Sequence, residues 1–366
     1  MATMHTGTDT SGELPVEYRF RPARNGNRHL VVVFANFDAP QDYGWSNGVL
    51  DNLRANVLWI RDRFDGHNSY YLSREGDRGV ERSVAATIDR FLDVLGLTHD
   101  DCTLLGSSKG ASAALYFGLA YGFRNIVAAA PQFSIGTYVQ QVHPTTARSM
   151  MGDAFGDDAV RALDASLPEL VRAKRNTGAN IYLFSSPSDA QYASQVRPHL
   201  LEFDGYDNFN FVFTDSPFVP DHTRVAGRNV PVIMGIVNLL IDGIAPRIGF
   251  VRNGYEDPAA DRTALDTHLE ATAAPGTWVA APVVESPADT GHFAGTARGA
   301  VTVQFWENGR YVGRTGVGAD GSWAWTRDTA WPTGRHTLRI FATNAHDVES
   351  ARTTVTFTTE PAYAHA

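Results

Sequence analysis

The sequence predicts an α/β protein, in which a mostly parallel sheet is covered by helices on both faces, followed by a smaller all-β unit. Over the first two thirds of the chain, short β-branched runs alternate with longer stretches of helical period. Several of these runs are apolar almost throughout, which is typical of strands buried on both faces. From about residue 277 the helical period disappears, and short alternating runs are separated by glycine or aspartate turns.

Seven strands are expected in the first part, each a short run rich in branched or aromatic residues. They span 16–23, 29–36, 56–60, 102–106, 125–131, 180–186 and 209–215. Helices are expected at 79–95, where apolar residues recur three or four apart, at 111–121 and at 231–241. We expect the first two to be crossovers between parallel strands and the third to close this part of the chain.

Composition indicates a folded, acidic protein. Of the 366 residues, 43% are apolar, which excludes a disordered chain and is enough for two or three domains. The net charge of −9 argues against a nucleic-acid partner. The longest apolar runs, such as 230–240, are shorter than the ~20 residues that span a bilayer, so no transmembrane segment is expected. The N-terminal residues lack the pattern of a secretory signal, which predicts a cytoplasmic location.

The expected domains are an α/β domain over 14–244, a linker or peripheral wrap over 245–276, and a β-sandwich over 277–359. The linker segment is rich in proline and has little periodicity. In the sandwich, Asn308-Gly309 and Asp320-Gly321 are expected to form tight hairpin turns with positive φ at both central positions. This part resembles a bacterial immunoglobulin-like repeat, which implies an immunoglobulin-like fold.

The pentapeptide Gly106-Ser107-Ser108-Lys109-Gly110 carries the chemistry, because it fits G-x-S-x-G between an expected strand and an expected helix. That context is typical of a nucleophile elbow, whereas an ordinary Gly-Ser loop is the alternative. The tight turn requires small residues two before and two after the nucleophile. Ser108 has glycines at both places and Ser107 does not, and the spacing of a Walker A phosphate loop is absent. Ser108 is therefore the candidate nucleophile.

An acid and a histidine are expected after the serine along the chain, each where a strand ends. Asp189 follows the strand 180–186 and is the candidate acid, with a helix N-cap as its structural alternative. His222 follows the strand 209–215 and is the candidate base. The alternatives for the acid are Asp204, Asp215 and Asp221. In these roles Ser108 attacks a carbonyl, the histidine carries its proton, and the aspartate fixes the imidazole tautomer.

Two backbone amides are expected to hold the oxyanion. One belongs to Lys109, the residue after the nucleophile, and the other to Asn36 or Phe37 in the loop after the second strand. Substrate contacts are expected from the loops at the same edge of the sheet, with burial as the alternative for the tyrosines; the candidates are Tyr43, Trp45, Tyr71 and Gln132. Asp62 also ends a strand there. A single cysteine, Cys102, excludes a Cys-based zinc site, and neither a metal nor an organic cofactor is implied.

Several of these runs together carry a family resemblance: HLVVVFANFDAP, LLGSSKGASAALYFGLAYGFRNIVAAAPQ, SPSDAQY and PDHTRV. They resemble the α/β-hydrolase-like proteins of capsule polysaccharide biosynthesis (the XcbB/CpsF type), and are more distantly similar to the hydrolase-like protein of the accessory Sec export system. The resemblance covers about 16–240, with Ala111 where a second glycine is expected. It implies a cytoplasmic protein of surface-glycan assembly that moves acetyl groups with a serine triad, here Ser108, Asp189 and His222.

Two classes of function are expected from these observations. The first is a serine esterase or O-acyltransferase acting on a glycan or glycoconjugate in surface polysaccharide biosynthesis, with an acylated small molecule as the other substrate class. The second is a non-catalytic scaffold or binding protein of the same fold for glycan-assembly enzymes. Reaction of Ser108 with a fluorophosphonate distinguishes them. For the β-sandwich, a structural or docking role is favoured over a sugar platform built from its tryptophans.

Overall fold

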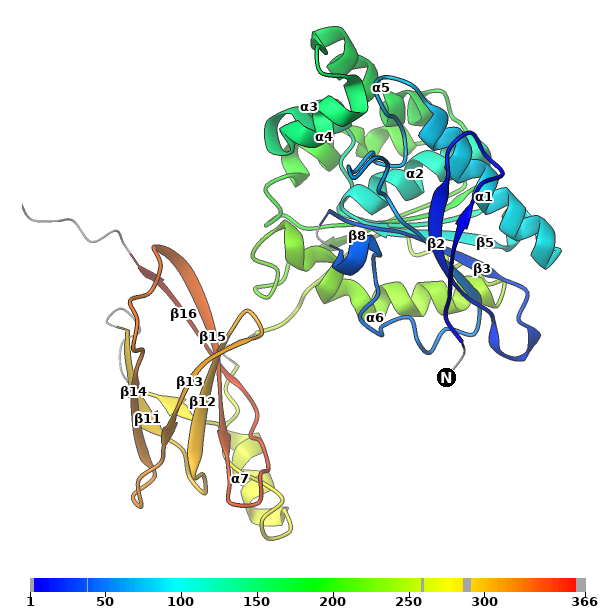
Figure 1. Cartoon of the computed structure of the whole chain (residues 1–366). Coiled ribbons are helices and arrows are strands. Elements are labelled where there is room, and N and C mark those ends of the chain that lie inside the picture. The colour runs from blue at the N-terminus through cyan, green and yellow to red at the C-terminus, as the bar shows by residue number, and fades with distance from the viewer. Residues whose placement is uncertain (1–2, 38, 258–259, 286–290, 360–366) are drawn as a thin grey trace, which may run out of the picture. The chain divides into compact units, whose positions relative to one another are not determined.

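The computed structural model describes residues 3–37, 39–257, 260–285 and 291–359. The chain divides into two compact units, Met1–Tyr255 and Glu256–Ala366 (Figure 1). Each unit is built around its own sheets.

The first unit is organised by a nine-stranded sheet with the order β1-β2-β4-β3-β5-β6-β7-β8-β9. The pairs β1–β2 and β2–β4 are antiparallel, and every other pair is parallel. The strands are β1 (His5–Asp9), β2 (Val16–Arg21), β3 (Leu30–Phe34), β4 (Asn56–Ile60), β5 (Cys102–Ser107), β6 (Asn125–Ala129), β7 (Asn180–Ser185), β8 (Asn208–Thr214) and β9 (Phe250–Asn253).

Helices cover both faces of this sheet (Figure 1). One face carries α1 (Gly79–Leu95), α2 (Lys109–Tyr121), α3 (Ile135–Val142), α4 (Pro144–Met151) and α5 (Asp157–Arg172), and the other carries α6 (His222–Ile241). Shorter helical turns span Arg24–Gly26, Pro40–Asp42, His99–Asp101, Tyr192–Val196 and Arg197–Phe203. The side chains of β3 alternate between two cores: Leu30, Val32 and Phe34 belong to the core under α1 to α5, and Val31 and Val33 to the core under α6.

The seven expected strands correspond to β2 to β8, but the structure adds elements at both edges. β1 and β9 are short and largely exposed, so neither has the buried apolar run by which the other strands are recognised. β9 and α7 (Thr263–Thr272) both lie in the segment 245–276 that was expected to be a linker. Three further unexpected helices, α3 to α5, stand between β6 and β7.

The helix α6 begins at His222, nine residues before the expected start at Pro231. Pro231 is accommodated inside the helix on its exposed side. Gly227, whose carbonyl loses its amide donor to the proline, is an exposed residue as well. By length and composition α6 is the one helix in the described ranges that could cross a bilayer, a test that core helices also pass. Its apolar side, including Ile233 and Val237, packs on the sheet.

The second unit contains α7 and two antiparallel sheets, with strand orders β10-β11-β14 and β13-β12-β15-β16. The strands are β10 (Val283–Val284), β11 (His292–Thr296), β12 (Thr302–Glu307), β13 (Arg310–Gly316), β14 (Ser322–Thr326), β15 (Gly334–Thr343) and β16 (Thr353–Thr359). Both sheets contribute to one core, in which Phe293 and Phe305 are fully buried. This arrangement is compatible with the expected sandwich. Trp323 is buried in the core, and Trp325 and Trp331 pack against it.

Asn308-Gly309 joins the paired strands β12 and β13 and is a hairpin turn, as expected. The expectation of a hairpin at Asp320-Gly321 is wrong, because that turn joins β13 to β14, which belong to different sheets. At Asn308-Gly309 both residues have positive φ, 48° and 79°, as expected. At Asp320-Gly321 the expectation of two positive φ values is wrong, because in the described chain only Gly321 of this pair has one, 83°. The Asp320 carboxylate instead accepts the amide of Ser322 at 3.0 Å, a local bond that stabilises the turn without a left-handed aspartate.

A ladder of buried asparagine side chains joins the starting ends of the parallel strands. Asn180 donates to Asn125 Oδ1 at 2.8 Å, and Asn208 donates to Asn180 Oδ1 at 2.8 Å. Asn210 extends the ladder by donating to Asn208 Oδ1 at 2.9 Å, and its own Oδ1 accepts two backbone amides just before β9 at 2.6 and 2.9 Å. The ladder thus joins the N-terminal ends of these strands, and the loops that follow the strands lie at the opposite end of the sheet.

Replacing the middle of this ladder should destabilise the first unit. Asn180→Ala leaves Asn125 Oδ1 without its donor, and we expect the free energy of unfolding to fall by about 1–3 kcal/mol. Urea unfolding measures the loss. The matched control is Asn52→Ala at an exposed loop position, which we expect to change stability by less than about 0.5 kcal/mol. Equal effects of the two variants would contradict a structural role for the ladder.

Candidate active site

Ser108 stands at a sharp turn between β5 and α2, with φ 53° and ψ −123°. A positive φ is unusual for a residue with a side chain and is held here by close packing of the backbone on both sides. A Cβ atom at Gly106 would lie 2.1 Å from the carbonyl oxygen of Gly110, and one at Gly110 would lie 2.3 Å from that of Phe34. Neither Gly106 nor Gly110 has room for a side chain, so glycine is required at both positions.

Three side chains from separate strand ends meet at this turn. His222 Nε2 lies 2.9 Å from Ser108 Oγ, and His222 Nδ1 lies 2.9 Å from Asp189 Oδ2. The second oxygen of Asp189 accepts the amide of Gln191 at 2.8 Å, so this carboxylate also caps the following turn. Asp189 is 1% exposed and His222 is 18% exposed, which leaves the imidazole open to a substrate and shields its carboxylate partner.

The alternative residues are engaged elsewhere. Asp215 pairs with Arg252, and Asp221 caps α6 by accepting the amide of Thr223. Asp204 accepts from Lys174 through its backbone carbonyl. The remaining alternative on the serine side, Ser107, lines the same pocket as Ser108. Of these two serines, it is Ser108 that forms the hydrogen bond to His222.

A pocket of about 400 Å³ opens over Ser108 and His222. Asn36 and Phe37, from the loop after β3, line it together with Tyr138 and His143 from the α3–α4 region. The lining is completed by Ser107, Ala129, Ala130, Gln191, Thr223 and Ala226. The rings of Phe37 and His143 stack with their centroids 3.8 Å apart, so the loop after β3 and the junction of α3 with α4 form one wall.

Gln132, expected to contact substrate, bonds directly to the candidate nucleophile. Its Nε2 donates to Ser108 Oγ at 3.0 Å and to Gln191 Oε1 at 2.8 Å. Its Oε1 accepts from the hydroxyl of Tyr70 at 3.3 Å. Because Gln132 donates to Oγ, the serine proton is left to point at His222.

The aromatic residues expected at the rim occupy three different environments. Trp45 lines a neighbouring pocket of about 260 Å³ that shares Asn36 and Ser107 with the pocket over Ser108. Tyr43 is buried beneath Arg19, whose guanidinium lies 4.2 Å from the ring centroid. The expected substrate contact is wrong for Tyr71, which is fully buried: its hydroxyl accepts the amide of Ala35 at 2.7 Å and donates to a backbone carbonyl.

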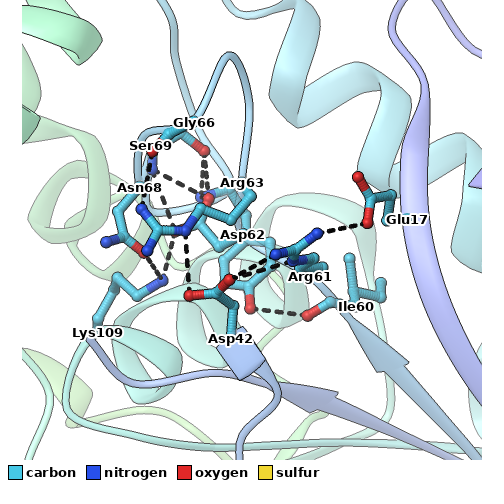
Figure 2. A network of polar contacts seen from close by, with 11 residues as sticks. Glu17, Asp42, Ile60, Arg61, Asp62, Arg63, Gly66, Asn68, Ser69 and Lys109 are labelled. Atoms are coloured by element: carbon cyan, nitrogen blue, oxygen red, sulfur yellow. Dashed lines mark hydrogen bonds and ion pairs between the residues drawn. The ribbon is translucent and has the colours of Figure 1, made fainter. Parts of the chain in front are cut away.

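The side chain of Lys109 is the functional feature that sequence reasoning missed, since only its amide was considered. It is fully buried and forms an ion pair with the equally buried Asp62 (Figure 2). Burial lowers the pKa of the Lys109 ammonium, and the Asp62 carboxylate opposes that shift. The signal for it in the sequence is the position of Asp62 just after β4, at the edge of the sheet where ligand contacts gather.

A second layer of charges lies next to this pair (Figure 2). Asp42 accepts from Arg61 at 2.9 Å and from Arg63 at 3.1 Å, and Arg61 also pairs with Glu17 at 2.7 Å. Burial opposes ionisation of Asp42, but the hydrogen bonds from the two arginines hold its pKa below the ordinary value.

In the described part of the chain, no three His, Cys, Asp or Glu side chains gather in a way that could hold a metal ion.

Alanine substitutions at two glycines should change the stability in opposite directions, one at the turn after Ser108 and one in α6. Gly110→Ala forces Cβ against the carbonyl of Phe34, and we expect a loss of about 3 kcal/mol in the free energy of unfolding. Gly235→Ala in α6 meets nothing within 4 Å and should raise it by about 0.5–1 kcal/mol. Urea unfolding of both variants is the measurement, and a tolerated alanine at residue 110 would contradict the packing described here.

The comparisons with known proteins find one distant match in sequence and a fold shared with solved hydrolase and acetyltransferase structures. No family model matches the chain. An accessory Sec system protein of Streptococcus gordonii is 29% identical over 113 residues, 31% of this chain and 21% of the relative, so the match spans about a fifth of that protein's length.

Three solved structures share the fold. The capsule O-acetyltransferase of Neisseria meningitidis serogroup A is 21% identical, with a TM-score of 0.50 over 63% of this chain and 97% of that one. The Gap123 glycosylation-associated protein complex of Streptococcus agalactiae is 17% identical, with a TM-score of 0.52 over 64% of this chain and 46% of that one. FphF, a fluorophosphonate-binding serine hydrolase of Staphylococcus aureus, is 11% identical, with a TM-score of 0.50 over 66% of this chain and 98% of that one. About two thirds of the chain thus share the fold of these hydrolase and acetyltransferase structures, and the chain has a distant match to an accessory Sec system protein.

Proposed function

We propose that this protein is a serine esterase or O-acyltransferase that acts on a glycan or glycoconjugate. The observation that carries the proposal is the hydrogen-bonded series from Ser108 Oγ through His222 to Asp189, with both distances at 2.9 Å, beneath an open pocket. A serine bonded to an imidazole that is oriented by a carboxylate is the arrangement that activates a hydroxyl for attack on a carbonyl.

In the first half-reaction Ser108 Oγ attacks the carbonyl carbon of an acyl donor, and its proton passes to His222 Nε2. Asp189 accepts a hydrogen bond from Nδ1–H of the same ring and stabilises the imidazolium without taking up its proton. The oxyanion is held by the amide of Lys109, which as the first residue of α2 has no acceptor within its helix, and by an amide of Asn36 or Phe37. The leaving oxygen takes the proton from His222, which leaves an acyl ester on Ser108.

In the second half-reaction an acceptor hydroxyl gives its proton to His222 and attacks the acyl ester. The bond from the acyl carbon to Ser108 Oγ then breaks, and Oγ takes the proton back from His222. If the acceptor is water, the product is a free acid; if it is a sugar hydroxyl, the acyl group is transferred. The pocket of about 400 Å³ leaves room for an acceptor beside the histidine. The glycan acceptor is supported by the names of the proteins that share this fold, a capsule O-acetyltransferase and a glycosylation-associated complex. A role beside partner proteins of glycan assembly is supported by the second of these names.

Fluorophosphonate labelling tests the nucleophile. We expect wild-type protein to gain one adduct by intact mass and to turn over short-chain p-nitrophenyl esters, because Ser108 is activated by His222. Ser108→Ala should lose both the adduct and the turnover, whereas Ser107→Ala, which changes a serine in the same pocket, should keep both. Folded wild type with neither adduct nor turnover would sink the enzyme proposal and favour a scaffold.

The choice of acid is tested by a matched pair of substitutions. Asp189→Asn removes the carboxylate that orients His222, and we expect kcat to fall by about 10⁴-fold, as for the acid of other serine triads. Asp215→Asn changes an aspartate that pairs with Arg252 and should alter kcat less than about threefold. Ester hydrolysis at saturating substrate is the measurement. Similar losses in both variants would contradict the assignment of Asp189.

A further inference from the structure

The buried pair Lys109–Asp62 is next to the candidate active site, because Lys109 follows Ser108 in the chain. Figure 2 shows the pair. Both side chains are 0% exposed, and Lys109 Nζ also donates to Asn68 Oδ1 at 3.0 Å. A buried ion pair is weak evidence for stability, because desolvation opposes the attraction between the charges and apolar residues of similar size often serve as well. Its retention beside a nucleophile therefore points to a requirement for position.

Asp62 organises the loop that follows β4. Its carboxylate accepts the amide of Ser69 at 3.0 and 3.1 Å, and the amide of Tyr71 at 3.4 Å (Figure 2). Tyr70 and Tyr71 both have positive φ, 55° and 60°. Two successive left-handed residues with large side chains are unfavourable in isolation, so the bonds to Asp62 are needed to hold this loop in place.

Through this loop Asp62 reaches two parts of the site. The hydroxyl of Tyr71 accepts the amide of Ala35 at 2.7 Å, immediately before Asn36 and the proposed oxyanion amides. The hydroxyl of Tyr70 donates at 3.3 Å to Gln132, which in turn donates to the nucleophile. The same carboxylate thus fixes the oxyanion loop on one side and the donor to Ser108 on the other.

Lys109 supplies the third connection. Its backbone amide is the other proposed oxyanion donor, and its ammonium lies 5.5 Å from the ring centroid of Phe37 and 5.0 Å from that of Tyr71. Those distances are typical of cation–π contacts. The residue that follows the nucleophile is thereby held to the oxyanion loop as well as to Asp62.

We propose that the Lys109–Asp62 pair is a positioning device that couples the nucleophile turn to the loop 35–37, so that the two oxyanion amides converge on one point. Neither side chain touches the substrate. The inference rests on the proposed acyl chemistry for its catalytic consequence, and on the structure alone for the coupling of the two segments.

Three variants separate positioning from stability. Lys109→Met and Asp62→Asn each leave one buried group without its partner, so each should lower the urea midpoint strongly. The double variant removes both charges and should recover much of the midpoint. Asn180→Ala, at the opposite end of the strands, is a destabilised control that leaves the site intact.

The chemical readout is the ratio of kcat/KM for an ester to kcat/KM for the corresponding thionoester. Sulfur accepts hydrogen bonds more weakly than oxygen, so misplaced oxyanion amides penalise the ester more. We expect the ratio to fall about 10–100-fold in the double variant, by analogy with loss of an oxyanion donor. In Asn180→Ala the ratio should stay at the wild-type value even if both rates change. A double variant with a recovered midpoint and a wild-type ratio would overturn the proposal.

The physical readout needs no turnover. Hydrogen exchange of the free protein should become faster at 35–37 and 107–112 together in the double variant and remain unchanged at both in Asn180→Ala. Unchanged exchange at 35–37 in the double variant would overturn the coupling. If wild type neither labels nor hydrolyses esters, the proposed acyl chemistry fails, and the exchange result still decides whether the pair couples the two segments.

Discussion

The closeness of the backbone at the turn after β5 is the constraint on which the rest of the site depends. With no Cβ at Gly110, the first turn of α2 lies directly against the carbonyl of Phe34, the last residue of β3. The loop with Asn36 and Phe37 leaves the sheet at that same point. The close approach that places Ser108 at the pocket therefore also places a second backbone segment beside it. The histidine and the acid come from strand ends farther along the sheet.

The sequence was sufficient for those parts of the fold that are locally encoded. Strands buried on both faces appear as apolar runs, and the glycines around Ser108 appear as a motif. The edge strands β1 and β9 have no buried run, so their pairing depends on neighbours that the sequence does not reveal. The side chain of Lys109 could not be placed, because a lysine is ordinarily exposed and its burial depends on Asp62, 47 positions away.

Polar side chains at the two ends of the sheet have different tasks. At the starting ends of the strands, asparagines bond to one another and to backbone, and such neutral groups satisfy buried amides without bringing charge inside. At the other end, carboxylates and cations are buried or half-buried, including Asp189 and the Lys109–Asp62 pair. Charge is thus buried where proton transfer is proposed, whereas the asparagine ladder at the opposite end carries none.

The hydrogen bonds through the site also have a common direction. Tyr70 donates to Gln132, Gln132 to Ser108, Ser108 to His222, and the imidazole to Asp189. Every hydrogen points toward the carboxylate, so the local dipoles add and each bond polarises the next. Reversal of any member would require two donors or two acceptors to face each other. Before any substrate arrives, the resting protein therefore holds one directed series of hydrogen bonds, from a buried tyrosine to the acid.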